Sequence, residues 1–269
     1  MPTYNSEGVL GRCLESIGRQ EDPPSQVIVS DGGSTDRTVE IARGFGAVVI
    51  EMQANRSAQR NAGARHASGE YLLFIDSDMC LTRKVITECL YGFGEAEAAL
   101  VIPEVFVGTG FWGRVRGFER RFYEGVWYIE AARWYRRDQF LELGGFDTRL
   151  VGPEDWDLDQ RIRQFGSVGR INAVIEHNEG HVRFGSVLDK KGHYAASFPL
   201  FMELHPERAA LCFSARRRIG LFLNRPKEMV RHPALLLGVG VLGAAEIVVS
   251  QRWCSNWLGP SRRPERRAV

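Results

Sequence analysis

The sequence predicts an α/β protein with a mostly parallel sheet flanked by helices and a helical extension at its C-terminus. Over the first 180 residues, short apolar runs alternate with segments of helical periodicity, a pattern typical of parallel strands joined by helical crossovers. Glycines and carboxylates follow several of these runs, and open α/β sheets bind ligands at the ends of their strands. With 269 residues and 44% hydrophobic content, the chain is long enough to bury a large core.

The expected elements up to residue 102 are strands and helices in alternation. A turn at Met1–Asn5 leads into a helix capped by Asn5 or Ser6. Because such a turn normally follows a strand of about five residues, we expect a first central strand to be missing from the start of the chain. Further strands are expected at Val27–Val29, Ala47–Ile50, Glu70–Ile75 and Ala99–Ile102, and further helices from Thr35 or Asp36, over Ser57–Ala67 and over Thr82–Tyr91.

The middle of the chain continues the alternation less regularly. Phe111–Tyr128 is rich in aromatic residues and arginines and is expected to be partly exposed. A strand at Arg133–Arg136 and a short helix at Asp138–Leu143 follow. A helix from Glu154 to Phe165, and then strands at Val168–Ile171 and Ala173–Glu176, are expected next.

The C-terminal part is helical, basic and apolar. From Arg208 onward it has 12 Lys/Arg against 3 Asp/Glu, whereas residues 1–207 have 23 against 30. The stretch Pro233–Ser250 carries Glu246 as its single charge and lies at the lower limit for spanning a bilayer, about 20 residues. We expect this helix to dip into one leaflet of an anionic membrane; a true span and a buried helix are the alternatives. Its basic flanks are Lys227, Arg231, His232, Arg252, Arg262, Arg263, Arg266 and Arg267, and Pro260–Val269 is expected to be disordered.

Five scattered cysteines lack the paired spacing of a zinc site or of a disulfide framework, which favours a reducing, cytosolic setting. The chain opens on polar turn residues instead of a charged and apolar leader, so translocation is not expected. No nucleic-acid partner is expected.

Two carboxylates, Asp76 and Asp78, follow the expected strand at Glu70–Ile75. Bare carboxylates resist burial unless they are paired or bind a cation. Mg²⁺ or Mn²⁺ takes a few carboxylate oxygens together with substrate phosphates, so this pair would be enough to anchor a metal-diphosphate. The alternative is a loop whose acids cap the next helix.

Several motifs in a fixed order resemble the family 2 inverting glycosyltransferases of the GT-A (Rossmann-like) fold. The resemblance covers about residues 1–180, and the ordered combination is specific although each motif alone is weak. The motifs are Pro2–Asn5, Asp31–Ser34 with Asp36, Arg60–Gly63, Asp76–Asp78, Gly144–Asp147 and Glu154–Asp155.

The resemblance implies a nucleotide site. Tyr4 would offer its ring to a base, Asp31 would accept from a uracil N–H, and Arg60 would offset diphosphate charge. An ordinary helix cap and a solvated arginine are the alternatives. The residues implied to bind nucleotide are Pro2, Thr3, Tyr4, Asn5, Asp31, Arg60, Asp76 and Ser77.

The resemblance also implies a Mg²⁺ or Mn²⁺ ion held by Asp78, with Asp76 on the metal, a bound water or the donor ribose. His177, placed after a strand, is a candidate for a further metal ligand or phosphate contact. A structural histidine is the alternative.

On the acceptor side, Asp155 is the implied catalytic base, and Glu154 would orient the base or the acceptor. Both acids would also favour a helix N-terminus through its dipole. Phe111–Tyr128 would lie over the acceptor cleft. The candidate acceptor contacts are Trp156, Arg183, Lys190 and Lys191, for which packing or solvation is the alternative.

The implied function is metal-dependent, inverting transfer of one sugar from a nucleotide-sugar, by preference a UDP-sugar. The acceptor would be a lipid-linked saccharide or glycolipid at the cytoplasmic face of a membrane. The Gln-x-x-Arg-Trp motif of processive synthases does not follow Glu154-Asp155, which favours transfer of a single sugar over polymer synthesis. The alternatives are a polyprenyl-phosphate sugar synthase and a catalytically silent nucleotide-sugar-binding or scaffold protein. The expected domains are 1–180 (catalytic), 181–225 (helical interface) and 226–269 (membrane-associating helix with a basic tail).

Overall fold

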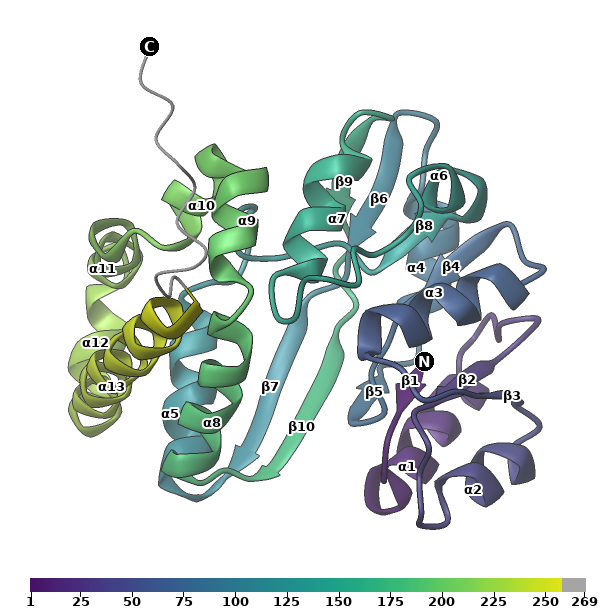
Figure 1. Cartoon of the computed structure of the whole chain (residues 1–269), viewed down its shortest axis with the longest axis horizontal. Coiled ribbons are helices and arrows are strands. Elements are labelled where there is room, and N and C mark those ends of the chain that lie inside the picture. Colours follow the sequence, from purple (N-terminus) through teal and green to yellow (C-terminus); the bar gives the residue numbers. More distant parts are fainter. Residues whose placement is uncertain (258–269) are drawn as a thin grey trace.

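Three small sheets with helices on their faces occupy the first part of the chain (Figure 1). The computed structural model describes the backbone of residues 1–257 and the side chains of residues 1–251. The elements of this part are β1 (Pro2–Thr3), α1 (Glu7–Gly18), β2 (Ile28–Asp31), α2 (Thr38–Gly44), β3 (Val48–Glu51), α3 (Arg56–His66), β4 (Tyr71–Leu73), β5 (Met79–Leu81), α4 (Val85–Gly92), β6 (Glu97–Val101), β7 (Glu104–Thr109), α5 (Gly110–Arg121), β8 (Trp134–Arg136), α6 (Arg137–Glu142), α7 (Glu154–Ile162), β9 (Ser167–Arg170) and β10 (Ile175–His181).

The strand order confirms the α/β class with a mostly parallel sheet. β1, β2 and β3 form one parallel sheet, with Pro2 opposite Ser30 and Val29 opposite Val49. The second sheet has the order β4-β8-β6-β9 and the third the order β5-β10-β7. In the described chain β8 is antiparallel to both of its neighbours and β5 is antiparallel to β10, while the other pairings are parallel.

The core explains why these segments fold as predicted. In α1, Leu10, Leu14 and Ile17 are buried at the expected helical spacing. They pack with β2 and with the segments around β5, and each fully buried aliphatic side chain stabilises the fold by about 1.5–3 kcal/mol. A second cluster joins Leu158 and Ile162 of α7 to the second sheet. Phe74 packs in the second cluster, whereas Ile75 and Met79 pack in the first. The two clusters together position the segment Phe74–Asp78.

Two expectations were wrong in detail. Pro2–Thr3 is a strand and not part of a turn, because the Met1 amino group donates to Ile28 O (2.9 Å) and Gly32 N donates to Thr3 O (2.8 Å). Beside β2, where we expected a strand to be missing, β1 contributes two residues, and the expectation of a missing strand stays a prediction. His177 lies within β10 rather than after a strand, since β10 runs on to His181 beside β7, a strand that we did not predict.

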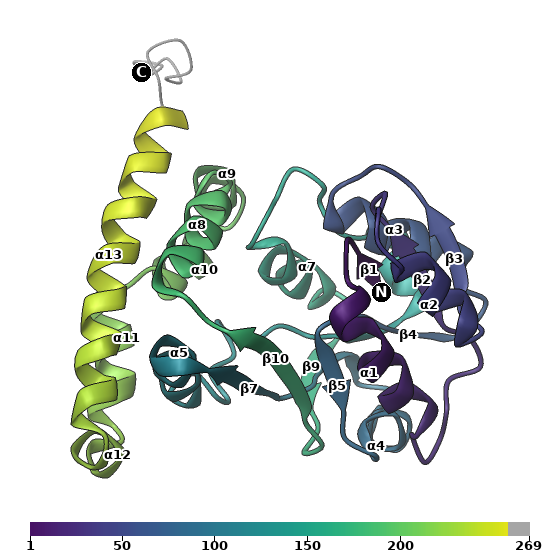
Figure 2. The same cartoon turned by 90° about the horizontal axis from the view of Figure 1, so that it is seen from below.

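Helices make up the C-terminal part, as expected. Between Pro233 and Gln251, α13 is long and apolar enough to cross a membrane (mean hydropathy 1.9), and 17% of that stretch is buried. It packs along α5 and α8 (Figure 2). The predicted disorder at Pro260–Val269 and the basic side chains from Arg252 onward lie outside the described residues. The helices are α8 (Phe184–Ala195), α9 (Phe198–Leu204), α10 (Pro206–Cys212), α11 (Ala215–Leu223), α12 (Pro226–Arg231) and α13 (Pro233–Trp257).

Candidate active site

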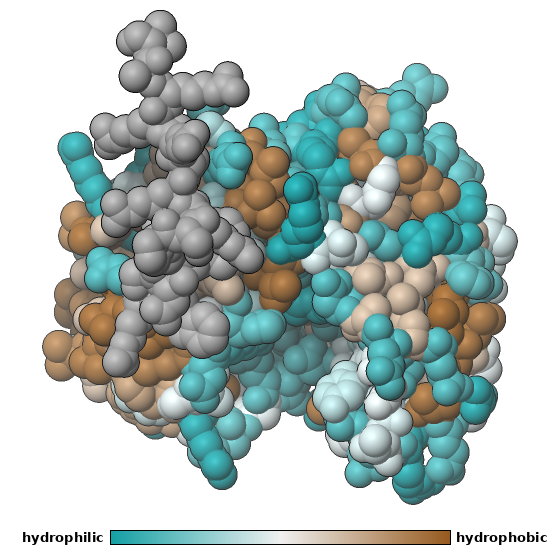
Figure 3. All heavy atoms as spheres, viewed as in Figure 1, coloured by the Kyte–Doolittle hydropathy of each residue, from teal (hydrophilic) through white to brown (hydrophobic). Residues whose placement is uncertain are grey.

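Two adjoining pockets lie where the sheets meet the C-terminal helices, and the surface is hollowed there (Figure 3). The larger measures about 740 Å³ and the smaller about 380 Å³; we call them the large pocket and the small pocket. Asp76, Ser77, Asp78 and His177 line both. The segment singled out for a metal therefore lies at the junction of the two pockets.

The small pocket is lined by three of the residues predicted to bind a nucleotide, Pro2, Thr3 and Tyr4. Tyr4 is 64% exposed, so one face of its ring is available to a flat ligand. Asn5 adopts φ 46°, a left-handed conformation that Asn tolerates, and its side chain accepts from Thr35 N (2.9 Å). Asn5 lines the large pocket instead.

Asp31 ends β2, is 1% exposed and lines neither pocket. Its Oδ1 accepts from the hydroxyls of Thr3 (2.8 Å) and Ser34 (2.6 Å), and its Oδ2 accepts from Gly33 N and Ser34 N. Burial alone would raise the pKa of Asp31, but these donors hold it below the ordinary value. A base N–H would have to replace one of the two hydroxyls.

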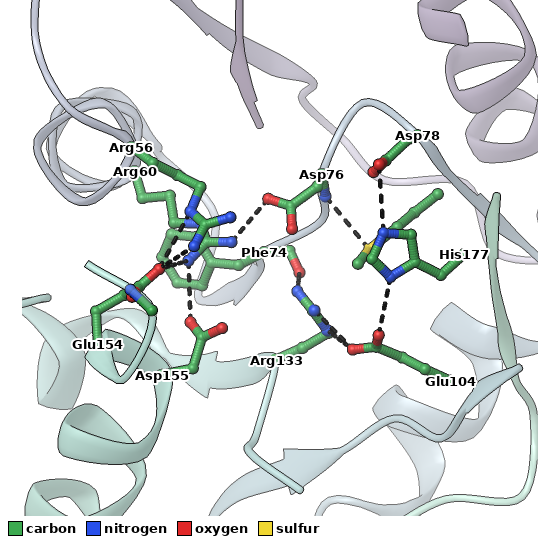
Figure 4. A network of polar contacts seen from close by, with 12 residues as sticks. Arg56, Arg60, Phe74, Asp76, Asp78, Glu104, Arg133, Glu154, Asp155 and His177 are labelled. Atoms are coloured by element: carbon green, nitrogen blue, oxygen red, sulfur yellow. Dashed lines mark hydrogen bonds and ion pairs between the residues drawn. The ribbon is translucent and has the colours of Figure 1, made fainter. Parts of the chain in front are cut away.

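Arg60 is 1% exposed, so the alternative of a solvated arginine is wrong. Its Nη2 donates to Asp76 Oδ1 (2.7 Å) and its Nη1 to Asp155 Oδ1 (2.9 Å), as Figure 4 shows. It lines neither pocket. Burial would raise the pKa of Asp76, but Arg60, Arg133 and Arg56 hold it well below its usual range. Arg60 therefore connects the two acids instead of facing the pockets.

The neighbour of Arg60 joins two of the motifs. Asn61 Nδ2 donates to Phe146 O (2.8 Å), and its Oδ1 accepts from Phe146 N (2.9 Å). A Cβ at Gly145, where φ is 75°, would come within 2.4 Å of Asn61 Oδ1, so only glycine fits there. The guanidinium of Arg60 lies 5.2 Å from the centre of the Phe146 ring. The motifs Arg60–Gly63 and Gly144–Asp147 are thus in direct contact in the fold.

His177 lies between two carboxylates. Its Nε2 is 3.2 Å from Asp78 Oδ2 and its Nδ1 is 3.3 Å from Glu104 Oε2 (Figure 4). Burial would lower the pKa of His177, but hydrogen bonds to the two acids raise it to about 9.

The donor set at the junction fits a metal that shares its coordination with a ligand. Within residues 1–251, no group of three or more His, Cys, Asp or Glu is arranged to hold an ion alone. Carboxylate oxygens of Asp76 and Asp78, with the imidazole of His177 beside them, face both pockets. Mg²⁺ and Mn²⁺ accept such a partial set and complete it with phosphate oxygens and water.

The two acids that begin α7 differ in environment. The Asp155 side chain is 29% exposed and lines the large pocket, whereas that of Glu154 is 1% exposed and lines neither pocket. Glu154 accepts from Gly152 N and from Arg56 Nη2 (2.5 Å). A direct acceptor contact is thus available to Asp155 and not to Glu154 in this conformation.

Of the predicted acceptor residues, three line the large pocket. Trp156 packs on Phe201 (ring centres 5.8 Å apart) and donates to Ile129 O (2.7 Å). Lys190 and Lys191 also line it, and each is paired with an acid. Arg183 is exposed and lines neither pocket.

Sequence reasoning missed many of the charged residues that line the large pocket, among them Arg133, Arg56 and Glu104. Arg133 Nη2 lies 2.6 Å from Glu104 Oε1, and Arg56 reaches Glu154 from the start of α3. Glu104 belongs to the unpredicted strand β7. The one available signal in the sequence was a charged residue at one end of an expected strand. Arg133, the first residue of the expected strand Arg133–Arg136, carries that signal.

Comparison with known proteins agrees with this geometry. A family model described as "Glycosyl transferase family 2" matches residues 1–150. A "PGL/p-HBAD biosynthesis glycosyltransferase" of Mycobacterium bovis is 30% identical over 207 residues, covering 71% of this chain and 80% of its own length. An uncharacterized glycosyltransferase of Haemophilus influenzae is 27% identical over 70% of this chain and 69% of its own length.

Solved structures show the same fold. A mannosyltransferase of Pyrobaculum calidifontis, in complex with GDP-Man and Mn²⁺, has a TM-score of 0.65 at 17% identity and covers 97% of this chain and 86% of its own. The S. aureus protein TarS (residues 1–349), in complex with UDP, has a TM-score of 0.55 at 21% identity and covers 73% of this chain and 63% of its own. These neighbours confirm the predicted GT-A fold.

Proposed function

Because the chain belongs to glycosyl transferase family 2, we propose that it transfers one sugar, with inversion, from a nucleotide-sugar to a membrane-associated acceptor. The observation that carries this proposal is the position of Asp76–Asp78 between the small pocket and the large pocket. A donor diphosphate at this junction would put its nucleoside in the small pocket and its sugar toward the large one.

The small pocket would hold the nucleoside. The nucleotide base would lie against the ring of Tyr4, and Pro2 and Thr3 would lie along the edge of the base. We propose UDP as the nucleotide, with the Thr3 and Ser34 hydroxyls rotating to let Asp31 accept from the base. The fold neighbours in complex with UDP support this choice, and the neighbour with GDP-Man is the reason to test others.

Asp78 and His177, with Asp76, would hold Mg²⁺ or Mn²⁺. The neighbour with GDP-Man contains Mn²⁺, and a fold neighbour with UDP, glucosyl-3-phosphoglycerate synthase, was solved with either ion. Such an ion supplies Lewis-acid stabilisation of the departing nucleoside diphosphate. Because its pKa is raised to about 9 between Asp78 and Glu104, His177 would have to lose a proton to become a ligand.

Asp155 would be the base. It would take the proton of an acceptor hydroxyl in the large pocket while that oxygen bonds to the anomeric carbon and the nucleoside diphosphate departs from the opposite face. Arg60 holds one carboxylate oxygen of Asp155 and one of Asp76, so it is a positioning residue that aligns the base with the metal motif. Glu154 would act one step further away, by holding Arg56 and Gly152.

The acceptor would be a lipid-linked saccharide or a glycolipid at the cytoplasmic face of a membrane. Trp156, Lys190 and Lys191 line the pocket where its head would bind, and α13 supplies an apolar surface next to it. In this proposal residues 1–180 hold the donor and the base, residues 181–225 border the acceptor, and residues 226–269 meet the membrane.

Release of nucleoside diphosphate from UDP-, GDP- and dTDP-sugars tests the proposal. We expect release from one donor class, only with Mn²⁺ or Mg²⁺ and only with a membrane extract as acceptor source. Bare polyprenyl phosphate serves as a separate arm, because activity with it would indicate a polyprenyl-phosphate sugar synthase. Binding of a nucleotide without release from any donor would support a silent binding protein and contradict the proposal.

A further inference from the structure

The helix α13 has two faces that differ in burial. Leu237, Val241 and Val248 are 73%, 55% and 62% exposed, and they recur at i, i+4 and i+11 on one stripe. Leu242 and Glu246, on the opposite side, are 1% and 8% exposed. The outward face is apolar, and nothing in the described chain buries it. The inward face carries Glu246, the helix's one described charge.

The inward face is attached to the rest of the protein by specific contacts. Leu242 packs with Val115 of α5 and Val187 of α8. Glu246 lies 3.2 Å from Lys191 Nζ and 3.8 Å from Arg116 Nη1. If α13 crossed a bilayer, these contacts would break and Glu246 would enter hydrocarbon, where an acidic side chain is strongly unfavourable. A side-on position keeps every one of these contacts.

Two neighbouring helices continue the exposed apolar surface and add positive charge to it. On α11, Arg216, Ile219 and Leu223 are exposed at i, i+3 and i+7. Both views place α11 and α12 beside α13, and apolar atoms gather over this region at the lower left of Figure 3. On α12, Val230 is 80% exposed and shares its helical face with Lys227 and Arg231.

The charge of this surface indicates which kind of partner it would bind. Residues 215–251 contain six Lys/Arg and two acids, and both acids are paired within the protein, Glu228 with Arg225 and Glu246 with Lys191. Exposed apolar side chains beside unopposed cations fit the interface of an anionic bilayer, which attracts each nearby Lys or Arg. A soluble protein partner would need an acidic, apolar groove, whereas a lipid surface supplies both features together.

We propose that α11, α12 and α13 form one docking surface that lies flat on an anionic bilayer, with α13 parallel to the membrane plane instead of across it. Glu246 also lines the large pocket, so the helix that touches the lipid forms a wall of that pocket. If the proposed function holds, an acceptor anchored in the bilayer would reach the large pocket along α13. Membrane docking itself needs no donor or acceptor and is measured separately from transfer.

Flotation of the full chain with vesicles tests the docking. We expect binding to vesicles containing phosphatidylglycerol and little binding to pure phosphatidylcholine. The double variant Leu237→Asp/Val241→Asp should bind about tenfold more weakly or less. The control is Tyr91→Asp, because Tyr91 is a highly exposed apolar residue (82%) on α4, far along the chain from the surface. Failure of the unmodified chain to float, or an equal loss in the control, would overturn the proposal.

Depth measurements distinguish lying flat from spanning. Spin labels at Leu237→Cys and Val248→Cys, in a background with Cys80→Ser and Cys254→Ser, report two points separated by 11 residues of helix. A flat helix gives both labels the same shallow depth. A spanning helix separates them by about 16 Å along the membrane normal, at 1.5 Å per residue, and that result would contradict the proposal.

Discussion

The small pocket is lined mostly by residues of the first 78 positions, with His177 of β10 and Lys190 of α8, whereas the large pocket is assembled from β7, β10 and the helices α5, α7, α8, α11 and α13. In the small pocket, Pro2 and Thr3 belong to β1, Tyr4 follows it, and Asp76–Asp78 follow β4. The large pocket depends on packing between segments as distant as Glu104 and Glu246. The proposed donor site therefore draws mainly on the first 78 residues, and the proposed acceptor site on elements from the whole described chain.

The two pockets also differ in charge. Three cations of the large pocket, Arg133, Lys190 and Lys191, are each paired with an acid of its wall. At the junction, Asp78 has only the imidazole of His177 beside it among its described ion pairs, and its side chain is 34% exposed. The junction is thus suited to a cation with its phosphate, and the large pocket to a polar head that exchanges hydrogen bonds.

The variant Asp155→Asn would separate the pockets most strongly. It removes the proposed base but keeps the shape that Arg60 contacts, so kcat should fall by about 10²–10⁴ while donor affinity stays the same. Steady-state transfer and donor titration calorimetry on one preparation measure both quantities. The matched control is Asp138→Asn, an exposed acid on α6. Near-normal kcat in Asp155→Asn would show that the base lies elsewhere.

The variant Asp78→Ala should act on the junction. Loss of the proposed metal ligand should weaken the Mn²⁺-dependent part of donor binding by about 100-fold, and metal-independent binding should change little. Titrations with Mn²⁺ and with EDTA give the two parts. Equal donor affinity of Asp78→Ala and the unmodified chain in Mn²⁺ would remove Asp78 from the metal site.

The variant Tyr4→Ala tests the small pocket alone. Loss of a stacking face should weaken donor affinity by about tenfold and leave kcat at saturating donor unchanged. Tyr91→Ala, which removes an exposed ring outside both pockets, is the control. A change in kcat without a change in donor affinity would contradict the assignment of the nucleotide base to the small pocket.

The variant Asp31→Asn should have the smallest effect, on stability. The pKa of Asp31 is lowered in the folded chain, so its ionised form stabilises the fold above the unfolded pKa, about 4. We expect Asp31→Asn to lower the free energy of unfolding by about 1 kcal/mol at pH 7. The difference should begin to shrink as the pH falls below about 4, where Asp31 of the unfolded chain becomes protonated, and should be lost as the pH falls through the lowered pKa of Asp31 in the folded chain. Urea unfolding over a pH series from 7 down to about 2 measures it; a difference independent of pH would contradict this account.

The sequence predicted β2, β3 and the helices α1, α2 and α3 because their apolar spacing is local, whereas β1 was expected as a turn. It also placed Asp76, Asp78 and Asp155 in the candidate site, because the first two follow a strand and the third lies at the start of a helix. It did not predict that Arg60 would be buried, since a helical arginine is normally exposed and its two partners lie 16 and 95 residues away. Nor did it predict Glu104 or the inward position of Glu246, because both depend on pairings between distant elements.

The position of a bound nucleotide tests the division of the site most directly. A crystal structure of the chain with UDP and Mn²⁺ would locate both. The account predicts the uracil beside Tyr4 in the small pocket, the diphosphate and the ion at Asp78, and the large pocket open beside Asp155. A nucleoside in the large pocket, or an ion that does not contact Asp78, would contradict it.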